Sequence, residues 1–293
     1  MIYTNKPNLP KFFFDALVWL FEKHDHPHGD YSTTGLQKSP RQHHLFKRHE
    51  KDIVVDIGSL IWLLFGIAGH ELIKRFKSKN HLQEEYLEVD ILGKKMSGIS
   101  DVYEENGDIL DAKFTSAYTV SNMSSLREWE AQLNIYAYLF AAHNFPVRDL
   151  YIVAMIRDWQ RSRVYGNYPK EATVTIPIAR WSKEDTELYI YDRVTTLEKH
   201  NDTPDDELPE CTREERWQKD DSFAVMKEGA KRATKLFDDL ASAEEHVKTL
   251  GPKFTVQPRI GEWTKCKHYC HAAQFCNQYK KYQAQFAQEQ DDE

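Results

Sequence analysis

The stretch from Ser97 to Lys113 reads SGISDVYEENGDILDAK and decides how this chain folds. Apolar and polar residues alternate on both sides of Asn106-Gly107, the dipeptide most typical of a tight turn between two antiparallel strands. The pattern therefore predicts a β-hairpin. Asp101 lies on its first strand, and Asp111 lies on its second strand, two residues before the lysine.

The length of the turn decides whether the two aspartates can act together. A two-residue loop of Asn106 and Gly107 would place Asp101 and Asp111 on opposite faces, because successive side chains in a strand point to opposite sides. A three-residue loop that begins at Glu105, with Gly107 in the left-handed conformation, places Asp101 opposite Asp111 on one face. We expect the three-residue loop, with the lysine at position 113 on the face of both acids.

Two neighbouring carboxylates repel each other unless a cation lies between them. Mg²⁺ binds carboxylate oxygens and keeps several waters, so one or two acids suffice to hold it. A lysine beside such an ion can orient the attacking water or stabilise charge on a phosphate. The alternative is a hairpin on which Asp101, Asp111 and Lys113 are merely solvated.

A helix is expected after the hairpin, from a capping box at Ser125 and Glu128 to about His143. Gln132 and Tyr136 are four residues apart and share one face of this helix. With these residues the chain resembles the PD-(D/E)XK nucleases of the RecB-like branch, which carry an aspartate, then Asp-x-Lys, then Gln-x-x-x-Tyr in this order. The resemblance implies an α/β, restriction-endonuclease-like core with a mixed central sheet flanked by helices.

The resemblance also implies a metal site. His70, within Gly66-Ile-Ala-Gly-His70, matches a metal-ligating helix histidine of that branch. One or two Mg²⁺ or Mn²⁺ ions would then be held by His70, Asp101, Asp111 and the carbonyl of Ala112.

The remaining motif residues take catalytic roles under the same resemblance. Lys113 would position or activate the attacking water, and Gln132 and Tyr136 would support the site or guide the DNA strand. The implied activity is that of a Mg²⁺- or Mn²⁺-dependent deoxyribonuclease, mostly exonucleolytic, in DNA recombination, repair or phage DNA processing. A non-catalytic DNA-binding or scaffold protein with the same fold is the alternative, and a structural zinc protein is another.

Charge is unevenly distributed along the chain. The net charge of −7 is unusual for a DNA-binding protein, but residues 38–51 and 74–79 are basic, and the acids gather in 202–207 and 289–293. A local basic channel suffices for an enzyme that must release its DNA, although solvated helix faces have the same composition. By the resemblance, Tyr31–Arg41 is a segment that contacts the phosphate backbone.

The four cysteines form a second candidate site. Cys211 is followed, after a long gap, by a close trio of Cys266, Cys270 and Cys276. No signal peptide opens the sequence and cysteine is too sparse for a disulfide scaffold, so a metal centre is favoured. Four thiolates bind either zinc or an iron–sulfur cluster, and free buried cysteines are a further alternative.

The cysteine pattern resembles that of the iron–sulfur nucleases in the RecB-like branch, which implies a 4Fe–4S cluster. In most of those nucleases the lone cysteine precedes the core, whereas Cys211 follows it and the early position near Ser39-Pro40 has none. A lone cysteine after the core is similar to the pattern of phage-encoded nucleases. His268 and His271 leave a mixed Cys/His zinc site open.

The whole pattern predicts two regions. Residues 1–200 form the nuclease core with N-terminal helices, and residues 201–293 form a helical region that carries the cysteines and packs on the core. Within it, 201–210 is expected to be a linker and 221–250 a polar helix.

The expected setting is the cytoplasm of a bacterial or phage-infected cell, without secretion. The longest apolar run, Ser59–Gly69, is too short to span a bilayer, so no membrane partner is expected. DNA is the expected partner, and a recombination or helicase protein and a second copy of the chain are further candidates.

Overall fold

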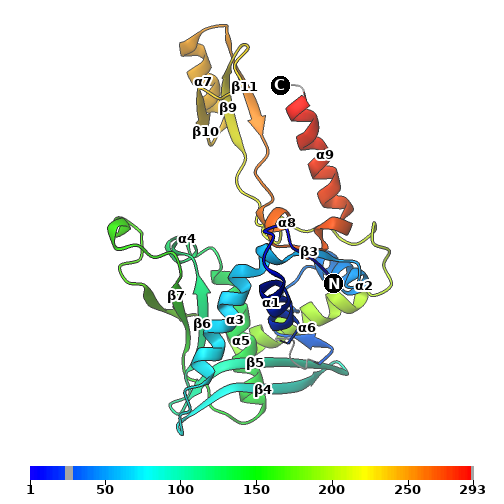
Figure 1. Ribbon diagram of the computed structural model, residues 1–293, viewed down its shortest axis with the longest axis vertical. Coiled ribbons are helices and arrows are strands. Elements are labelled where there is room, and N and C mark those ends of the chain that lie inside the picture. The colour runs from blue at the N-terminus through cyan, green and yellow to red at the C-terminus, as the bar shows by residue number, and fades with distance from the viewer. Residues whose placement is uncertain (24–28, 292–293) are drawn as a thin grey trace. The chain divides into compact units, whose positions relative to one another are not determined.

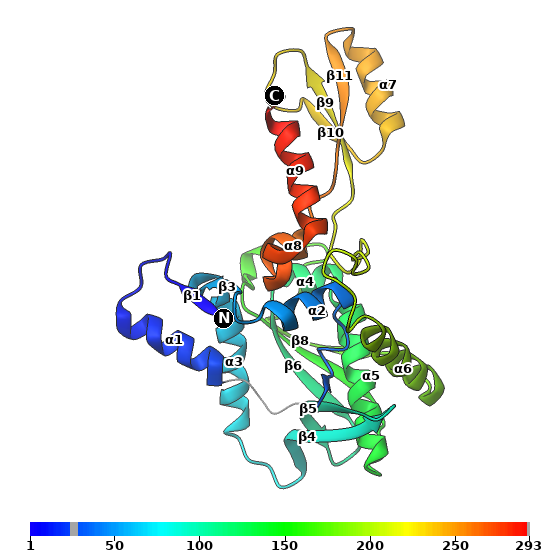
Figure 2. The same cartoon turned by 90° about the vertical axis from the view of Figure 1, so that its right-hand side faces the viewer.

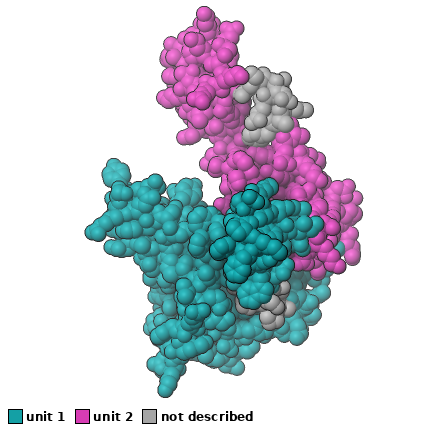
Figure 3. Space-filling model, in the orientation of Figure 1, with its two compact units in different colours: residues 1–38, 54–201 teal, residues 39–53, 202–293 magenta. Residues whose placement is uncertain are grey.

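The computed structural model describes residues 1–23 and 29–291. The chain divides into two compact units (Figure 3): unit 1 contains residues 1–38 and 54–201, and unit 2 contains residues 39–53 and 202–293. The sequence placed residues 39–53 in the first region, whereas the structure joins them to the second. Their helix packs on C-terminal segments that lie more than 150 residues away in the sequence, a contact that local patterns do not indicate.

The centre of unit 1 is a six-stranded sheet (Figure 1). Its strands are β2 (Tyr31–Ser32), β4 (His81–Ile91), β5 (Lys94–Glu104), β6 (Ile109–Thr115), β7 (Leu150–Ile156) and β8 (Thr173–Ile178). They are arranged in the order β2–β5–β6–β7–β8, and β4 pairs with β5. The pairs β2–β5 and β6–β7 are parallel and the others antiparallel. The predicted α/β fold with a mixed central sheet flanked by helices is therefore confirmed.

Helix α5 (Leu126–Ala142) covers one face of this sheet. Its Leu133 and Phe140 are fully buried in the same core as Ile109 and Ile152 of the strands. The helix begins and ends where predicted, but the capping box is wrong: Ser125 is the N-cap, and its side chain makes no capping hydrogen bond. Helix α6 (Lys183–Lys199) packs on α5, and the short helices α4 (Ala117–Asn122) and η2 (Arg161–Arg163) lie in the connections.

Helix α3 (Ile61–Lys74) packs on the other face of the sheet, against β6 (Figure 2). Glycine at position 69 allows this approach, because a Cβ there would lie 2.0 Å from Cζ of Phe114. Before α3, β1 (Ile2–Thr4) pairs in parallel with β3 (Val54–Asp56), and α1 (Lys11–Lys23) and η1 (Ile57–Leu60) complete this end of unit 1.

The apolar helix is longer than the sequence indicated. Ile57–Lys74, which joins η1 to α3, is the one helix of the described residues with the length and composition of a membrane span, with a mean hydropathy of 1.3 and 28% of it buried. Core helices meet the same criteria. Because Gly69 packs on Phe114 and the next residue faces the candidate site, this helix has a structural place in unit 1.

Unit 2 has a small core of its own. Its buried members come from 39–53, from 202–210 and from the C-terminal segments, and are Leu45, Leu208, Ala272, Ala273, Cys276, Tyr279 and Tyr282. The helices are α2 (Pro40–His49), α8 (Thr264–His268), η3 (His271–Phe275) and α9 (Asn277–Asp291). The expected linker 201–210 is thus partly a core segment, since Leu208 is almost completely buried.

A small sheet module occupies most of the expected helix 221–250, so that expectation is wrong. Strands β9 (Ser222–Lys227), β10 (Lys235–Phe237) and β11 (Phe254–Arg259) form an antiparallel sheet in the order β10–β9–β11, and only α7 (Leu240–Leu250) is helical. Gly229, at a φ of +75°, allows the turn that ends β9.

Candidate active site

The hairpin has the predicted turn. Gly107 has a φ of +91°, its N–H donates to the carbonyl of Glu104 at 2.9 Å, and the Glu104 N–H donates to the carbonyl of Asp108 at 2.9 Å. Val102 then pairs with Leu110, and this register continued by one step sets position 101 opposite position 111. The three-residue loop is therefore confirmed, and both aspartates belong to one face of the hairpin.

The backbone pairing between β5 and β6 ends before positions 101 and 111, where a side chain makes the next hydrogen bond between the two strands. Oδ2 of Asp101 accepts the N–H of Ala112 at 2.7 Å. This bond replaces a backbone contact, so it fixes the carboxylate in the opening between the two strands. The contact that Ala112 makes at the site is thus its N–H, and its carbonyl stays a predicted ligand.

A chain of polar contacts holds the lysine. Nζ of Lys113 lies 2.6 Å from Oδ2 of Asp111 and donates to Oε1 of Gln132 at 2.9 Å. Nε2 of Gln132 donates in turn to the hydroxyl of Tyr136 at 3.0 Å. Burial, and then the charge of Asp111, raise the pKa of Tyr136, so the phenol stays neutral. The structure brings these four predicted residues together, with Gln132 and Tyr136 behind the lysine.

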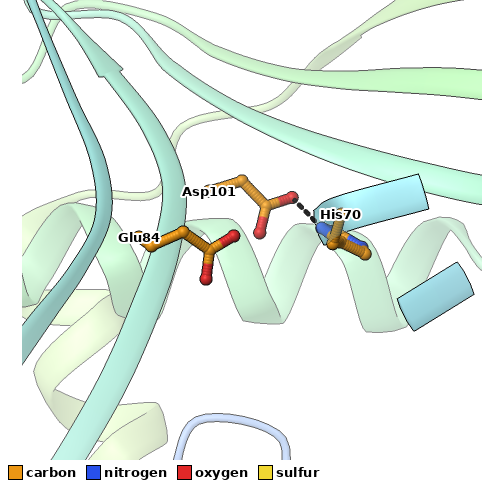
Figure 4. A group of neighbouring side chains, drawn as sticks. All are labelled: His70, Glu84 and Asp101. Atoms are coloured by element: carbon orange, nitrogen blue, oxygen red, sulfur yellow. Dashed lines mark ion pairs between the residues drawn. The ribbon is translucent and has the colours of Figure 1, made fainter. Parts of the chain in front are cut away.

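Three side chains from three elements, one of them Asp101, meet at the site (Figure 4). His70 comes from α3, Glu84 from β4 and Asp101 from β5, and one ligand atom of each lies within 4.8 Å of the others. Nδ1 of His70 is 3.5 Å from Oδ2 of Asp101. This is the one group of three or more potential metal ligands at such distances in the described parts of the chain.

The sequence did not point to Glu84. It lies on β4 opposite Asp101, between the paired residues Gln83 and Glu85. Its φ of +53° is unusual inside a strand for any residue but glycine and costs roughly 1–2 kcal/mol. The left-handed backbone turns this carboxylate toward Asp101 and His70, and a strand pattern gives no sign of such a local turn. The only available signal was two consecutive glutamates in a strand.

The acids of the site influence one another's ionisation. Burial, and then the charge of Asp111, raise the pKa of Asp101 well above its usual value. Oδ2 of Asp111 is buried and accepts no hydrogen bond, although the ammonium of Lys113 is close. A cavity of about 230 Å³, with room for several waters, is bordered by His70, Glu84 and Asp101. Clustered acids that repel one another, beside an open cavity, fit a divalent cation.

The predicted metal set is therefore only partly assembled. His70 and Asp101 are together, but Asp111 lies outside the three-residue group and pairs with Lys113. Glu84 takes the third place in its stead.

The N-terminal segment and the first basic stretch are used for internal contacts. Arg41 is buried in unit 2, where it donates to the carbonyls of Leu208 and Pro209. Arg48 lies 2.6 Å from a carboxylate oxygen of Asp205, in the acidic stretch 202–207. These arginines are not available to a phosphate backbone, so that expectation is wrong for them.

The four cysteines of unit 2 come together without forming disulfides. Every one of the six pairs among Cys211, Cys266, Cys270 and Cys276 is close enough for an electrostatic interaction. Burial is the main cause that raises the pKa of Cys211, of Cys266 to about 12 and of Cys270 to about 11. Four thiols gathered in a partly buried site are unfavourable to ionise unless they share a cation.

The spacing of the sulfur atoms bears on what they could hold. Four thiolates around one zinc ion, with Zn–S of about 2.3 Å, place their sulfurs about 3.8 Å apart. Among the described residues, no three of these cysteines, with or without a histidine, lie within 4.8 Å of one another. Each such set therefore includes at least one pair of ligand atoms more than 4.8 Å apart. Ser39, near the early position that lacks a cysteine, lies with its Oγ 3.1 Å from Sγ of Cys211.

No protein-family model matches the chain, and no curated protein matches it in sequence. Among solved structures, the chain is similar to the crystal structure of SSO0001, with a TM-score of 0.47 and 17% identity over 67% of this chain and 89% of that one. It is also similar to the crystal structure of a phage related exonuclease from Haemophilus somnus 129PT, with a TM-score of 0.29 and 12% identity over 67% of this chain and 83% of that one. Such distant likenesses assign no activity, so the function is argued from the site.

Proposed function

We propose that this protein is a metal-dependent deoxyribonuclease of the PD-(D/E)XK type, in its RecB-like branch. The observation that carries the proposal is the meeting of His70, Glu84 and Asp101 next to the ion pair of Asp111 and Lys113. An imidazole and carboxylates can hold a metal ion, and an ammonium beside them can stabilise the charge that develops when a phosphodiester is hydrolysed.

The cation would be held by His70, Glu84 and Asp101, with Asp111 as the adjoining carboxylate. Bound there, Mg²⁺ or Mn²⁺ would stabilise charge on the phosphate under attack and lower the pKa of the attacking water. An imidazole among the ligands suits Mn²⁺ better than Mg²⁺, because Mg²⁺ prefers oxygen ligands.

Lys113 supplies the positive charge that the protein itself places at the reaction centre. Its ammonium has three donors: one is bonded to Gln132, and one side of the group faces Asp111. A donor is left for a phosphate oxygen or for the attacking water. Because Gln132 gives its amide N–H to Tyr136, its oxygen is kept toward the lysine.

Cleavage of end-labelled linear and circular DNA tests the proposal, with Mg²⁺, Mn²⁺ or EDTA. We expect metal-dependent loss of the linear DNA and a rate roughly 10²–10⁴-fold lower for Lys113→Ala, the usual range for a lost proton-transfer or charge-stabilising group. Survival of the circles would support exonucleolytic action in recombination, repair or phage DNA processing. Retained DNA binding without cleavage under any metal would contradict the proposal and favour a non-catalytic scaffold.

The role of Glu84 has a matched control in the next residue along the strand. Glu84→Gln removes a charge from the three-residue group, whereas Glu85→Gln removes the same charge from the neighbouring position, which lies outside that group. We expect Glu84→Gln to raise the Mn²⁺ concentration for half-maximal binding by about 10- to 100-fold, and Glu85→Gln to leave it near the wild-type value. Equal values for the two variants would exclude Glu84 as a ligand.

We also propose that the four cysteines hold a 4Fe–4S cluster. The convergence of all four thiols supports it, and so does the resemblance of the cysteine pattern to that of iron–sulfur nucleases. A cluster would fix Cys211 to the C-terminal trio and so close the chain around the sheet module. Purification without air, followed by visible absorption and iron and zinc analysis, tests this. A brown protein with about four irons is expected, and a colourless protein with one zinc would contradict it.

A further inference from the structure

We propose that one end of the sheet module in unit 2 binds the phosphate backbone of a nucleic acid. The end in question, called here the basic tip, comprises the turn after β9, the start of β10, the last turn of α7 and the start of β11. Its cations are Lys227, Lys231, Arg232, Lys235, Lys248 and Lys253. The ligand is taken from the proposed function, on which the inference rests to that extent.

The topology of the module collects these cations. Lys227 ends β9 and pairs with Phe254, the first residue of β11, while β10 begins at the same end, at Lys235. The Glu228 N–H donates to the carbonyl of Lys253 at 2.8 Å, which joins the turn to the segment between α7 and β11. Residues separated by up to 26 positions therefore lie together at one end of the sheet.

All but one of the acids of the module lie away from this end. Asp238 and Asp239 follow β10 at the opposite end, and Asp239 caps the first turn of α7. Glu244 and Glu245 lie in the middle of that helix. Glu228 is the one acid of the basic tip. The module is thus polarised, within a chain whose net charge is −7.

Lys235 of the basic tip lies over the Phe237 ring, with its Nζ 4.6 Å from the ring centroid, whereas four other cations of the tip are uncommitted. Lys227, Lys231, Arg232 and Lys253 are exposed, and within the described part of the chain none of them forms an ion pair. Other cations of unit 2 are engaged: Arg41 and Arg48 bind 202–210, and Lys219 and Lys267 both contact Glu262. Exposed like charges held together without partners repel one another, and a polyanion relieves that repulsion.

The surface beside these cations is hollowed rather than flat. A groove of about 410 Å³ is lined by Met226–Lys231 of the turn and by 255–257 of β11. Gly229 carries no side chain, and an added Cβ there would meet nothing, so the groove is open at the turn. Contacts between such cations and the phosphate backbone of a nucleic acid do not distinguish one base sequence from another.

Salt-dependent DNA binding tests the proposal. The whole protein is titrated, without added divalent cations, into two labelled duplexes of unrelated sequence. Affinity is followed by fluorescence anisotropy at salt concentrations of roughly 0.05 to 0.3 M. Each neutralised phosphate adds about 0.9 to the slope of log K against log[salt]. For Lys231→Ala combined with Arg232→Ala, we expect the slope to fall by about 1.8 and the affinity to drop on the order of 10- to 60-fold at 0.1 M salt, equally for both duplexes. Glu228→Gln is expected to raise the affinity.

A double variant on α6, Lys183→Ala with Lys199→Ala, is the matched control, because it changes the net charge equally on exposed lysines. An equal loss in this control, or an unchanged slope in the tip variant, would overturn the proposal. A tip variant that loses binding to phosphatidylserine vesicles while keeping DNA binding would overturn it in favour of a membrane. Because no metal is added, DNA binding is measured independently of cleavage. If the protein binds DNA through the basic tip but never cleaves it, the proposed nuclease activity is wrong and the proposed binding surface stands.

Discussion

The hairpin site and the cysteine site are both proposed to hold metal, yet they are built on different foundations. Asp101, Lys113 and Gln132 lie on long elements of the large core of unit 1, the strands β5 and β6 and the 17-residue helix α5. Cys266 lies on a five-residue helix, and Cys270 and Cys276 flank another of five residues. Cys211 lies in a segment without helix or strand.

The difference indicates which of the two sites depends on a bound metal for its folded structure. Hydrogen bonds from Ala112 to Asp101 and from Lys113 to Gln132 hold the hairpin site in place before any cation arrives. Around the cysteines, short helices and a small core supply little stability of their own. We infer that the metal at the first site is catalytic and that the metal at the second site is structural.

The largest effect is expected from a lost cysteine. Cys266→Ala should lower the free energy of unfolding of unit 2 by at least about 4 kcal/mol, because a structural metal centre contributes its binding energy to folding. Lys113→Ala should leave the stability of unit 2 unchanged, because Lys113 lies in unit 1, while it lowers the cleavage rate roughly 10²–10⁴-fold. Calorimetry of both variants measures this. If Cys266→Ala lowers the free energy of unfolding no more than an ordinary substitution of a small buried residue does, the cysteines hold no structural metal.

The second effect concerns the hairpin site and pH. Because the pKa of Asp101 is raised in the folded state, its contribution to stability is fully present below its unfolded value of 3.8 and is lost as pH rises through the folded pKa. We therefore expect the protein without divalent cations to lose stability as pH rises above that value. Asp101→Asn, which can still accept the Ala112 N–H, should flatten the profile and stabilise the protein at neutral pH by about 1–3 kcal/mol. Thermal melts from pH 4 to 8, with and without Mn²⁺, measure it. A wild-type profile parallel to that of the variant would refute this account of the site.

The smallest effect compares two glycines of α3. Gly69→Ala should cost about 1–3 kcal/mol and weaken Mn²⁺ binding, because its Cβ would push against the Phe114 ring, on which His70 also packs at 5.8 Å between ring centroids. Gly66→Ala meets nothing within 4 Å and should stabilise the helix by about 0.4–1 kcal/mol. Chemical denaturation and Mn²⁺ titration of the pair test this, and equal stabilities would show that α3 does not need its close approach to the sheet.

The sequence predicted those parts of the molecule that local rules determine. Asn106-Gly107 and the two-residue period of a strand set the hairpin register, and the four-residue spacing of Gln132 and Tyr136 put both on the side of α5 that faces Lys113. Each of these inferences spans only a few residues. The roles of the residues in catalysis and in metal binding stay predictions.

The parts that were missed depend on long-range contacts or on a local exception. Glu84 faces the site only because its backbone is left-handed within a strand, which no alternation pattern indicates. Arg41 looked like a DNA contact and is instead buried among carbonyls of 202–210, 160 or more residues away. Residues 222–227 combine apolar and β-branched side chains that suit either element, and pairing with the distant β11 decides for a strand.

The base of the sheet module has a practical consequence. Where the chain leaves for β9 and returns from β11, the two segments are fastened together: Gln218 pairs with Trp263, the Lys219 N–H donates to the carbonyl of Glu262 at 3.0 Å, and the Gly261 N–H donates to Asp221 at 2.8 Å. Because the two ends of residues 222–259 are held close together, this segment can be exchanged as a unit. It could be replaced by a short turn, or by another small domain whose ends meet, while Cys211 and Cys266 keep their places in the chain on either side. Such replacements offer a way to change which ligand this part of the protein binds.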